Sequence, residues 1–211
     1  MIYAYIAIAV IFISVTVFLL NSKMFASFRE GDKKRTFDFL VSLISTFIGF
    51  FIALSLNTLS GTVTQKKNLV KLLDTSNLSI ENTEMKINGM YMATAKAGQD
   101  ITPVIMSSPV ELPRLYESIE TNSLANDYLS AAAFQAYVLC SDNMRFFVKS
   151  ANGVTTTNEQ KVQVLTKYLK YLDLAKKVNN LEIQRLKGSL SESDEDSQLQ
   201  KLINEITANQ K

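Results

Sequence analysis

The amino-terminal part of the chain contains two long apolar runs, which are separated by a charged connector. Residues 2–20 form nineteen consecutive positions without a charged side chain, and residues 39–56 form eighteen more. Because a helix rises about 1.5 Å per residue, either run covers most of a hydrocarbon core of roughly 30 Å. The pattern predicts two transmembrane helices, at about 2–20 and 38–57, which together form a transmembrane hairpin over residues 1–58.

The first run has an alternative interpretation, because a cleavable signal peptide is also apolar. Signal peptides carry a basic start and a shorter apolar core. This chain has no Lys or Arg before Lys23, so the composition favours a retained span.

Small side chains recur every four residues in the second run, at Ser45, Gly49 and Ala53. This spacing places them on one helix face, where they let a neighbouring backbone approach closely. The pattern predicts a packing seam between spans or between protomers. Small residues are also common in membrane helices that have no such role.

Beyond the second span the apolar spacing is helical as far as Leu73, so the span is expected to continue as a helix. Another helix is expected over about 77–97, after a short polar segment and before Gly98. Residues 99–108 surround a proline and are expected to form a loop, with a short pair of strands around Ile101–Met106 as the alternative.

Capping residues predict the helices of the second half. The segment Ser108-Pro109-Val110-Glu111 resembles a capping box with a proline at the first helical position. Pro113 interferes with a helix from there, and a short helix from Pro113 to Thr121 is the alternative. Ser130 is expected to cap an Ala-rich helix that stops at Asn152-Gly153. Its buried face is predicted from residues at helical spacing, namely Ala133, Tyr137, Cys140, Met144 and Phe147.

The longest soluble helix is expected to begin at Thr156 or Thr157, with Glu159 or Gln160 completing a capping box, and to end before Gly188. Residues 191–197 are acidic and suggest a linker or a helix start, and a tail helix is expected over about 198–208. The fold is therefore predicted to be mainly all-α, with two transmembrane helices, a compact helical soluble domain over 59–190, and an acidic linker with a short tail helix over 191–211.

Composition excludes several kinds of active site. The chain has no histidine and no tryptophan, and Cys140 is its one cysteine, which rules out an intramolecular disulfide. Without histidine there is no Ser-His-Asp or Cys-His pair, and most zinc sites are excluded. We expect no enzyme activity, no catalytic residue, no metal and no cofactor. The net charge of +2 gives no field that would favour duplex nucleic acid.

A basic face on the longest soluble helix is the candidate ligand-binding site. Three lysines alternate with two tyrosines there, at Lys167, Tyr168, Lys170, Tyr171 and Lys177. Ammonium groups could neutralise phosphates, and tyrosine rings could stack on bases. A solvated outer face, or one that lies against anionic lipid headgroups, is the alternative.

The layout of the whole chain, with the spans MIYAYIAIAV… and FLVSLISTFIGF… followed by a helical domain, resembles bacterial antiphage membrane effectors. It is similar to small type III CRISPR-associated effectors with an amino-terminal membrane domain. The resemblance implies a two-pass protein of the bacterial inner membrane whose cytoplasmic domain binds a cyclic oligoadenylate. It also implies a homo-oligomer, such as a tetramer, that then perturbs or permeabilises the bilayer. The resemblance is one of layout, so no ligand-binding residue is carried over from it.

The charge distribution leaves the orientation open. The connector 21–37 holds five basic residues, whereas the segment after the second span holds Lys66, Lys67 and Lys71. The positive-inside rule then places the connector in the cytoplasm and both chain ends outside. The resemblance implies a cytoplasmic soluble domain, and we favour it because the difference in charge is small. A membrane-anchored scaffold or interaction protein of the cell envelope, without ligand-gated activity, is the alternative function.

Overall fold

The computed structural model describes residues 34–154 and 156–208, together with Val10, Ile11, Ser14 and Phe18. The described part of the chain consists of helices and the segments that join them, and it contains no strand. The prediction of an all-α fold is therefore confirmed. The first predicted span, 2–20, lies outside the described residues except at those four positions, so the two-span hairpin stays a prediction.

The chain divides into two compact units, residues 1–65 and 66–211. In the first unit, helix α2 begins at Lys34 and contains the predicted second span. Together with the helical turns that continue it to Lys96, it is the one helix in the described part of the chain that is long and apolar enough to cross a bilayer. Its most apolar window has a mean hydropathy of 1.8 and contains no buried residue.

Apolar side chains of this stretch face outwards, with Phe39 and Leu56 exposed over 65% and 61% of their surfaces. An apolar helix in the core of a soluble protein would be mostly buried, whereas an exposed apolar patch of this size marks an interaction surface or a membrane segment. The exposure supports association of α2 with a membrane.

The second unit contains the rest of α2, which ends at Lys86. The predicted break near residues 74–77 is wrong, because these polar residues continue the helix. Ser76 is buried. Asn77 accepts a hydrogen bond from Asn179 Nδ2 at 2.7 Å and donates one to Asn180 Oδ1 at 2.9 Å. The polar segment lacks Gly and Pro, and its side chains join α2 to α8.

A π-helix, η3 (Ile87–Met92), continues α2 and leads into the short helix α3 (Ala93–Lys96). The wide turn of a π-helix is rare and often lies at functional sites. Here Ile87 and Tyr91 are both buried. The helix ends where predicted, at Gly98, which adopts the left-handed φ of 72° that favours glycine.

Residues 99–108 are not a loop or strand pair, because helix α4 covers Thr102–Ser107. Its first turn tolerates Pro103, since the N–H that proline lacks would have no partner there in any case. Asp100 Oδ1 accepts the backbone N–H of Thr102 at 2.9 Å, and this bond lowers the pKa of the Asp100 carboxyl.

Two short helices follow an irregular segment. Helix α5 covers Tyr116–Thr121, which starts three residues later than predicted from Pro113. Helix α6 covers Ser123–Tyr128 and is capped by Asn122, whose side chain accepts the N–H of Leu124. The sequence analysis did not predict α6, because six residues carry too little apolar periodicity.

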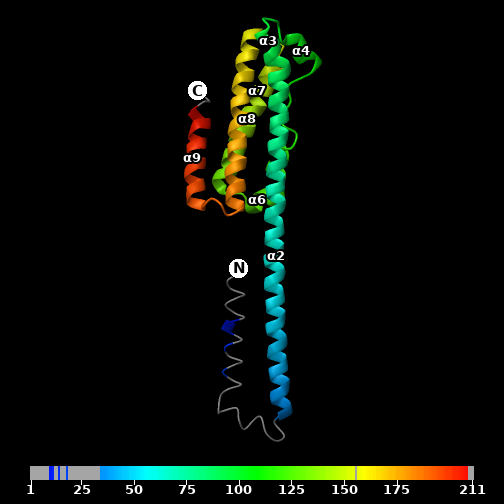
Figure 1. Cartoon of the computed structure of the whole chain (residues 1–211), viewed down its shortest axis with the longest axis vertical. Coiled ribbons are helices and arrows are strands. Elements are labelled where there is room, and N and C mark those ends of the chain that lie inside the picture. Colours follow the sequence, from blue (N-terminus) through cyan, green and yellow to red (C-terminus); the bar gives the residue numbers. More distant parts are fainter. Residues whose placement is uncertain (1–9, 12–13, 15–17, 19–33, 155, 209–211) are drawn as a thin grey trace. The chain divides into compact units, whose positions relative to one another are not determined.

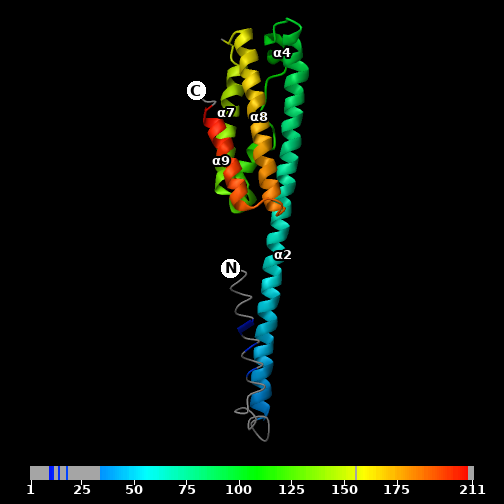
Figure 2. The same ribbon diagram turned by 60° about the vertical axis from the view of Figure 1, so that its left-hand side comes forward.

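Three longer helices lie side by side in the second unit, as Figures 1 and 2 show: α7 (Ala131–Ala151), α8 (Asn158–Leu186) and α9 (Glu192–Ala208). The predicted Ser130 cap of α7 is confirmed, as is the capping box of Thr157 and Gln160 at α8. The acidic segment is the start of α9 rather than a linker. Because α9 packs on α7 and α8, it belongs to the same compact unit.

The predicted buried face of α7 is confirmed at all five positions, which are Ala133, Tyr137, Cys140, Met144 and Phe147. Burial raises the pKa of the Cys140 thiol to about 12, which makes it unreactive at neutral pH. Cys140 therefore acts as a small apolar core residue.

Two leucines on α2 test the packing of this helix on the second unit. Leu73 is fully buried, whereas Leu78 is 59% exposed. Leu73→Ala should lower the free energy of unfolding by about 2–5 kcal/mol, because it removes buried methyl groups and leaves a cavity. The control Leu78→Ala should change it by about 0.5 kcal/mol or less. Denaturant unfolding of the full-length protein in detergent measures both, and equal effects would contradict the packing described here.

Candidate functional site

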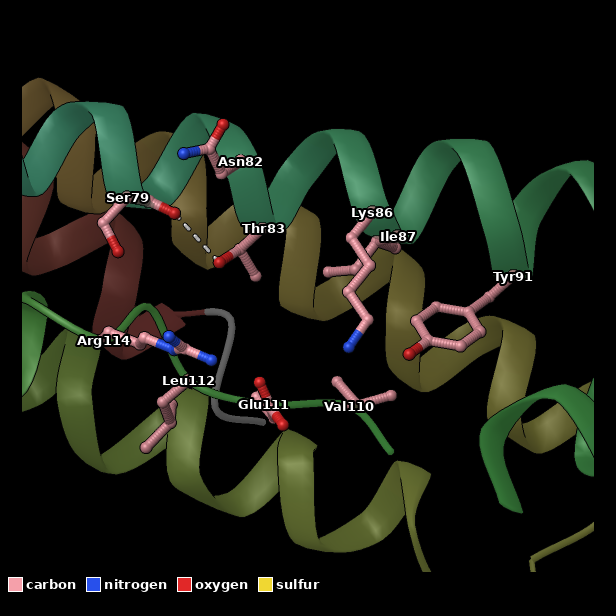
Figure 3. Close-up of a pocket in the computed structure, with 10 residues that line it drawn as sticks. All are labelled: Ser79, Asn82, Thr83, Lys86, Ile87, Tyr91, Val110, Glu111, Leu112 and Arg114. Atoms are coloured by element: carbon pink, nitrogen blue, oxygen red, sulfur yellow. Dashed lines mark hydrogen bonds between the residues drawn. The ribbon is translucent and has the colours of Figure 1, made fainter. Parts of the chain in front are cut away.

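A groove of about 280 Å³ lies in the second unit, between the α2–η3 helix and the irregular segment that follows α4 (Figure 3). The helix contributes Ser79, Asn82, Thr83, Lys86, Ile87 and Tyr91 to the lining. The segment contributes Val110, Glu111, Leu112 and Arg114. The groove therefore includes the junction between α2 and the π-helix.

Side chains of the helix hold the segment in place. The Tyr91 hydroxyl donates to Ser108 O at 2.7 Å and lies 3.3 Å from Pro109 O. Lys86 Nζ donates to Pro109 O at 3.2 Å. Tyr91 is fully buried, so its hydroxyl satisfies backbone carbonyls that would otherwise lack a partner.

Helices α7 and α8 support the segment from its other side. Asn152, just after α7, accepts the N–H of Val110 at 3.0 Å and donates to Val110 O at 2.9 Å. From α8, the Tyr168 hydroxyl donates to Glu111 O at 2.8 Å. These bonds fix both backbone groups of Val110 and the carbonyl of Glu111, so this wall of the groove is preorganised.

Two cationic side chains reach into the groove from opposite sides, Lys86 from the helix and Arg114 from the segment (Figure 3). Within residues 34–154 and 156–208, the side chains of Ser79, Asn82 and Arg114 form no hydrogen bond or ion pair. One carboxylate, Glu111, also lines the groove and is exposed. Two cations against one exposed carboxylate favour a small anion.

The chemistry of these groups suits the binding of an anion. A guanidinium, an ammonium, a hydroxyl and an amide all donate hydrogen bonds to phosphate or carboxylate oxygens. Among the described residues, no group of three or more His, Cys, Asp or Glu side chains could hold a metal ion. The groove can therefore recognise an anion by charge and by hydrogen bonds.

The structure separates the five residues of the predicted basic face. Tyr168 and Tyr171 are buried, so their rings have no free face for stacking on a base. Burial also raises the pKa of both phenols. Lys170 Nζ pairs with Glu205 at 3.4 Å, and Lys177 Nζ pairs with Asp173 at 2.8 Å.

Lys167 and Lys177 line two other grooves. Lys167 lies with the exposed Phe146 in a groove of about 420 Å³ beside α7 and α8. Lys177 lies with Lys201 in an open groove of about 780 Å³ beside α8 and α9. The three lysines do not converge on one of these grooves, and their phosphate-binding role stays a prediction.

The predicted packing seam of the second span lies on the surface of the described chain. Ser45, Gly49 and Ala53 are exposed. A Cβ atom added at Gly49 would meet no atom within 4 Å. The role of this seam in packing against a partner helix stays a prediction.

Neither Lys86 nor Arg114 is predicted as a site residue from the sequence. Both are isolated basic residues, 28 positions apart in the sequence, and neither belongs to a motif. Lys86 and Tyr91 bond to the carbonyls of Pro109 and Ser108, and Asn152 bonds to Val110, which holds the segment of Arg114 beside the helix of Lys86. These are tertiary contacts between residues far apart in the chain, so no local sequence pattern predicts the arrangement.

Comparison with models of known protein families, with curated proteins and with solved structures finds no match.

Substitution of Asn152 tests whether its two hydrogen bonds to Val110 stabilise the wall of the groove. Asn152→Ala removes both bonds to Val110 and should lower the free energy of unfolding by about 1–3 kcal/mol, because partly buried backbone groups lose their partners. Asn126, whose side chain is exposed, provides the control Asn126→Ala, expected to change stability by about 0.5 kcal/mol or less. Thermal unfolding of the full-length protein in detergent compares them, and an Asn152→Ala variant as stable as the control would contradict this role.

Proposed function

We propose that this chain is a membrane-anchored effector without enzyme activity, whose helical domain binds a small phosphate-bearing signal. The ligand lies in the groove of Lys86 and Arg114, in place of the basic face predicted on α8. Ligand binding changes the arrangement of oligomerised spans and perturbs or permeabilises the bilayer. Cyclic oligoadenylates are the class of signal that the resemblance of layout suggests.

The observation that carries this proposal is the convergence of Lys86 and Arg114 on one preorganised groove. A guanidinium can hold a phosphate through two parallel hydrogen bonds, and an ammonium adds a point charge. The volume of about 280 Å³ is at the small end for ligand sites. It suits one phosphate group of a ligand whose remaining part lies outside the groove.

The ligand-binding residues and the apolar span share one helix, which supports a coupling between them. Ser79, Thr83 and Lys86 belong to α2, as does the exposed apolar stretch from Phe39 to Leu56. A ligand shifts the equilibrium between two states only by its difference in affinity for them. To invert a 1:99 population, that difference must be about 5.5 kcal/mol.

Self-association through the second span completes the proposed mechanism. The face of Ser45, Gly49 and Ala53 is exposed and lacks bulky side chains, as required for close helix packing in lipid. The lack of histidine in the sequence and of a metal-binding cluster among the described residues agrees with a non-enzymatic role.

Charge-removing variants test the ligand site. The full-length protein in detergent is titrated with cyclic oligoadenylates of several ring sizes, and binding is measured by calorimetry. Lys86→Gln and Arg114→Gln should each weaken binding by at least about tenfold, because hydrogen bonds to charged groups contribute about 1.5–3 kcal/mol. The matched control Lys167→Gln removes a lysine from the groove beside α7 and α8 and should leave the affinity unchanged.

Other results of this titration would indicate a different binding site or a different function. Loss of binding in Lys167→Gln but not in the other two variants would move the site to the predicted basic face. If the protein binds no cyclic oligoadenylate of any ring size, the proposed ligand class is wrong and the scaffold function remains. A topology reporter fused after Lys211 separates these functions further, because a periplasmic signal contradicts a cytoplasmic effector domain.

A further inference from the structure

The Arg185 guanidinium joins the ends of three helices in the second unit. Its Nε lies 2.6 Å from Glu182 Oε2 and its Nη2 lies 3.0 Å from Glu182 Oε1, which makes a bidentate pair within α8. The same Nη2 donates to Tyr128 O at the end of α6. Glu182 Oε1 also accepts the N–H of Ser130, the cap of α7, at 2.6 Å. The pair therefore fixes α6 and α7 on α8.

A second carboxylate, Glu195 of α9, lies against this pair. Its Oε2 is 3.1 Å from Arg185 Nε, and the side chains of Glu182 and Glu195 are both 0% exposed. Neither oxygen of Glu195 accepts a hydrogen bond from the described residues. Because the Arg185 guanidinium already forms a bidentate pair with Glu182, one positive charge faces two buried carboxyls.

The charged side chains around Glu195 do not balance the negative charge of the two carboxyls. A cavity of about 400 Å³ beside it is also lined by Lys66 of α2, Asp127 of α6, and Glu192 and Asp196 of α9. Counted with Glu182, Arg185 and Glu195, the group contains two basic and five acidic side chains. Burial and the neighbouring Glu182 raise the pKa of the Glu195 carboxyl to about 8.

The rest of α9 is held mainly by apolar contacts with the unit. Leu199, Ile203 and Ile206 are buried. The Tyr171 hydroxyl donates to Ile206 O at 3.1 Å, and Lys170 Nζ lies 3.4 Å from Glu205 Oε1. Only the first turns of α9 depend on a buried ionisable group, so a change of charge there acts on the start of the helix.

We propose that Arg185, Glu182 and Glu195 form a proton-binding site that controls the docking of α9. With a proton on the Glu195 carboxyl, the site holds a single ion pair and α9 stays docked. Ionisation breaks the O–H bond of Glu195, transfers the proton to water and leaves a buried negative charge beside Glu182. The cost of this charge favours undocking of the first turns, where the carboxylate reaches water.

The sign of the pH dependence follows from the higher pKa of the docked state. The docked state binds the proton more tightly, so the full contribution to docking is present below the ordinary pKa of 4.5 and is lost as pH rises to about 8. Within this window the ratio of docked to undocked α9 should fall about tenfold per pH unit.

Hydrogen–deuterium exchange of the full-length protein in detergent tests the proposal. Protection factors of α9 amides, corrected with an unstructured reference peptide for the intrinsic pH dependence, are compared between pH 6 and pH 9. Wild-type protection in the first turns of α9 should fall by about tenfold per pH unit up to about pH 8 and then level off. Glu195→Gln should remove this fall, whereas the exposed control Glu159→Gln, in the first turn of α8 and at the other end of that helix from Arg185, should keep it.

An unchanged protection of the wild type over this range would overturn the proposal, as would a Glu195→Gln variant that keeps the wild-type fall. Asp196→Asn provides a second test that leaves the packing intact, because Asp196 is exposed. The Asp196 charge raises the pKa of Glu195, so its removal should make protection level off at a lower pH. Levelling off at the same or a higher pH would contradict the proposed site.

Discussion

The proposed function depends on the preference of the exposed apolar stretch of α2 for lipid over water. Residues 39–56 contain twelve Phe, Leu, Ile and Val side chains, and no residue of the most apolar window is buried. At about −0.3 to −0.6 kcal/mol each, these side chains favour a bilayer by about 4–7 kcal/mol before other terms. In water the same surface would promote aggregation, which insertion into a bilayer would prevent.

In the second unit the same helix is partly buried. There it buries one face, with Leu69, Leu73 and Ile80 in the core, and its polar residues bond to α8. Its π-helical end then positions one wall of the anion-binding groove. Helix α2 thus serves as an apolar segment, as a core helix and as a part of the candidate site without a change of secondary structure before Lys86.

The elements that could be predicted are those with a strong local signal. The caps at Ser130 and Thr157 and the stop at Gly98 were correct, because capping hydrogen bonds and a left-handed φ depend on single residue types. The break near residues 74–77 and the loop at 99–108 were wrong, because polar side chains and a proline also fit helices when tertiary contacts or a first-turn position accommodate them. The buried Glu195 was missed for a similar reason: in the sequence it looks like one of several solvated acids.

The candidate site could not be predicted from the sequence at all. Basic residues on α8 were chosen for their density, but Tyr168 and Tyr171 belong to the core. Lys86 and Arg114 line one groove because tertiary hydrogen bonds of Lys86, Tyr91 and Asn152 hold the segment after α4 beside α2.

Extraction of cell membranes tests whether α2 is inserted in the bilayer. Cells that produce the full-length protein are broken, and the membrane fraction is washed with alkaline carbonate before ultracentrifugation. A protein with an inserted helix should stay in the pellet and be released only by detergent. Recovery of the folded protein in the aqueous supernatant without detergent would contradict it.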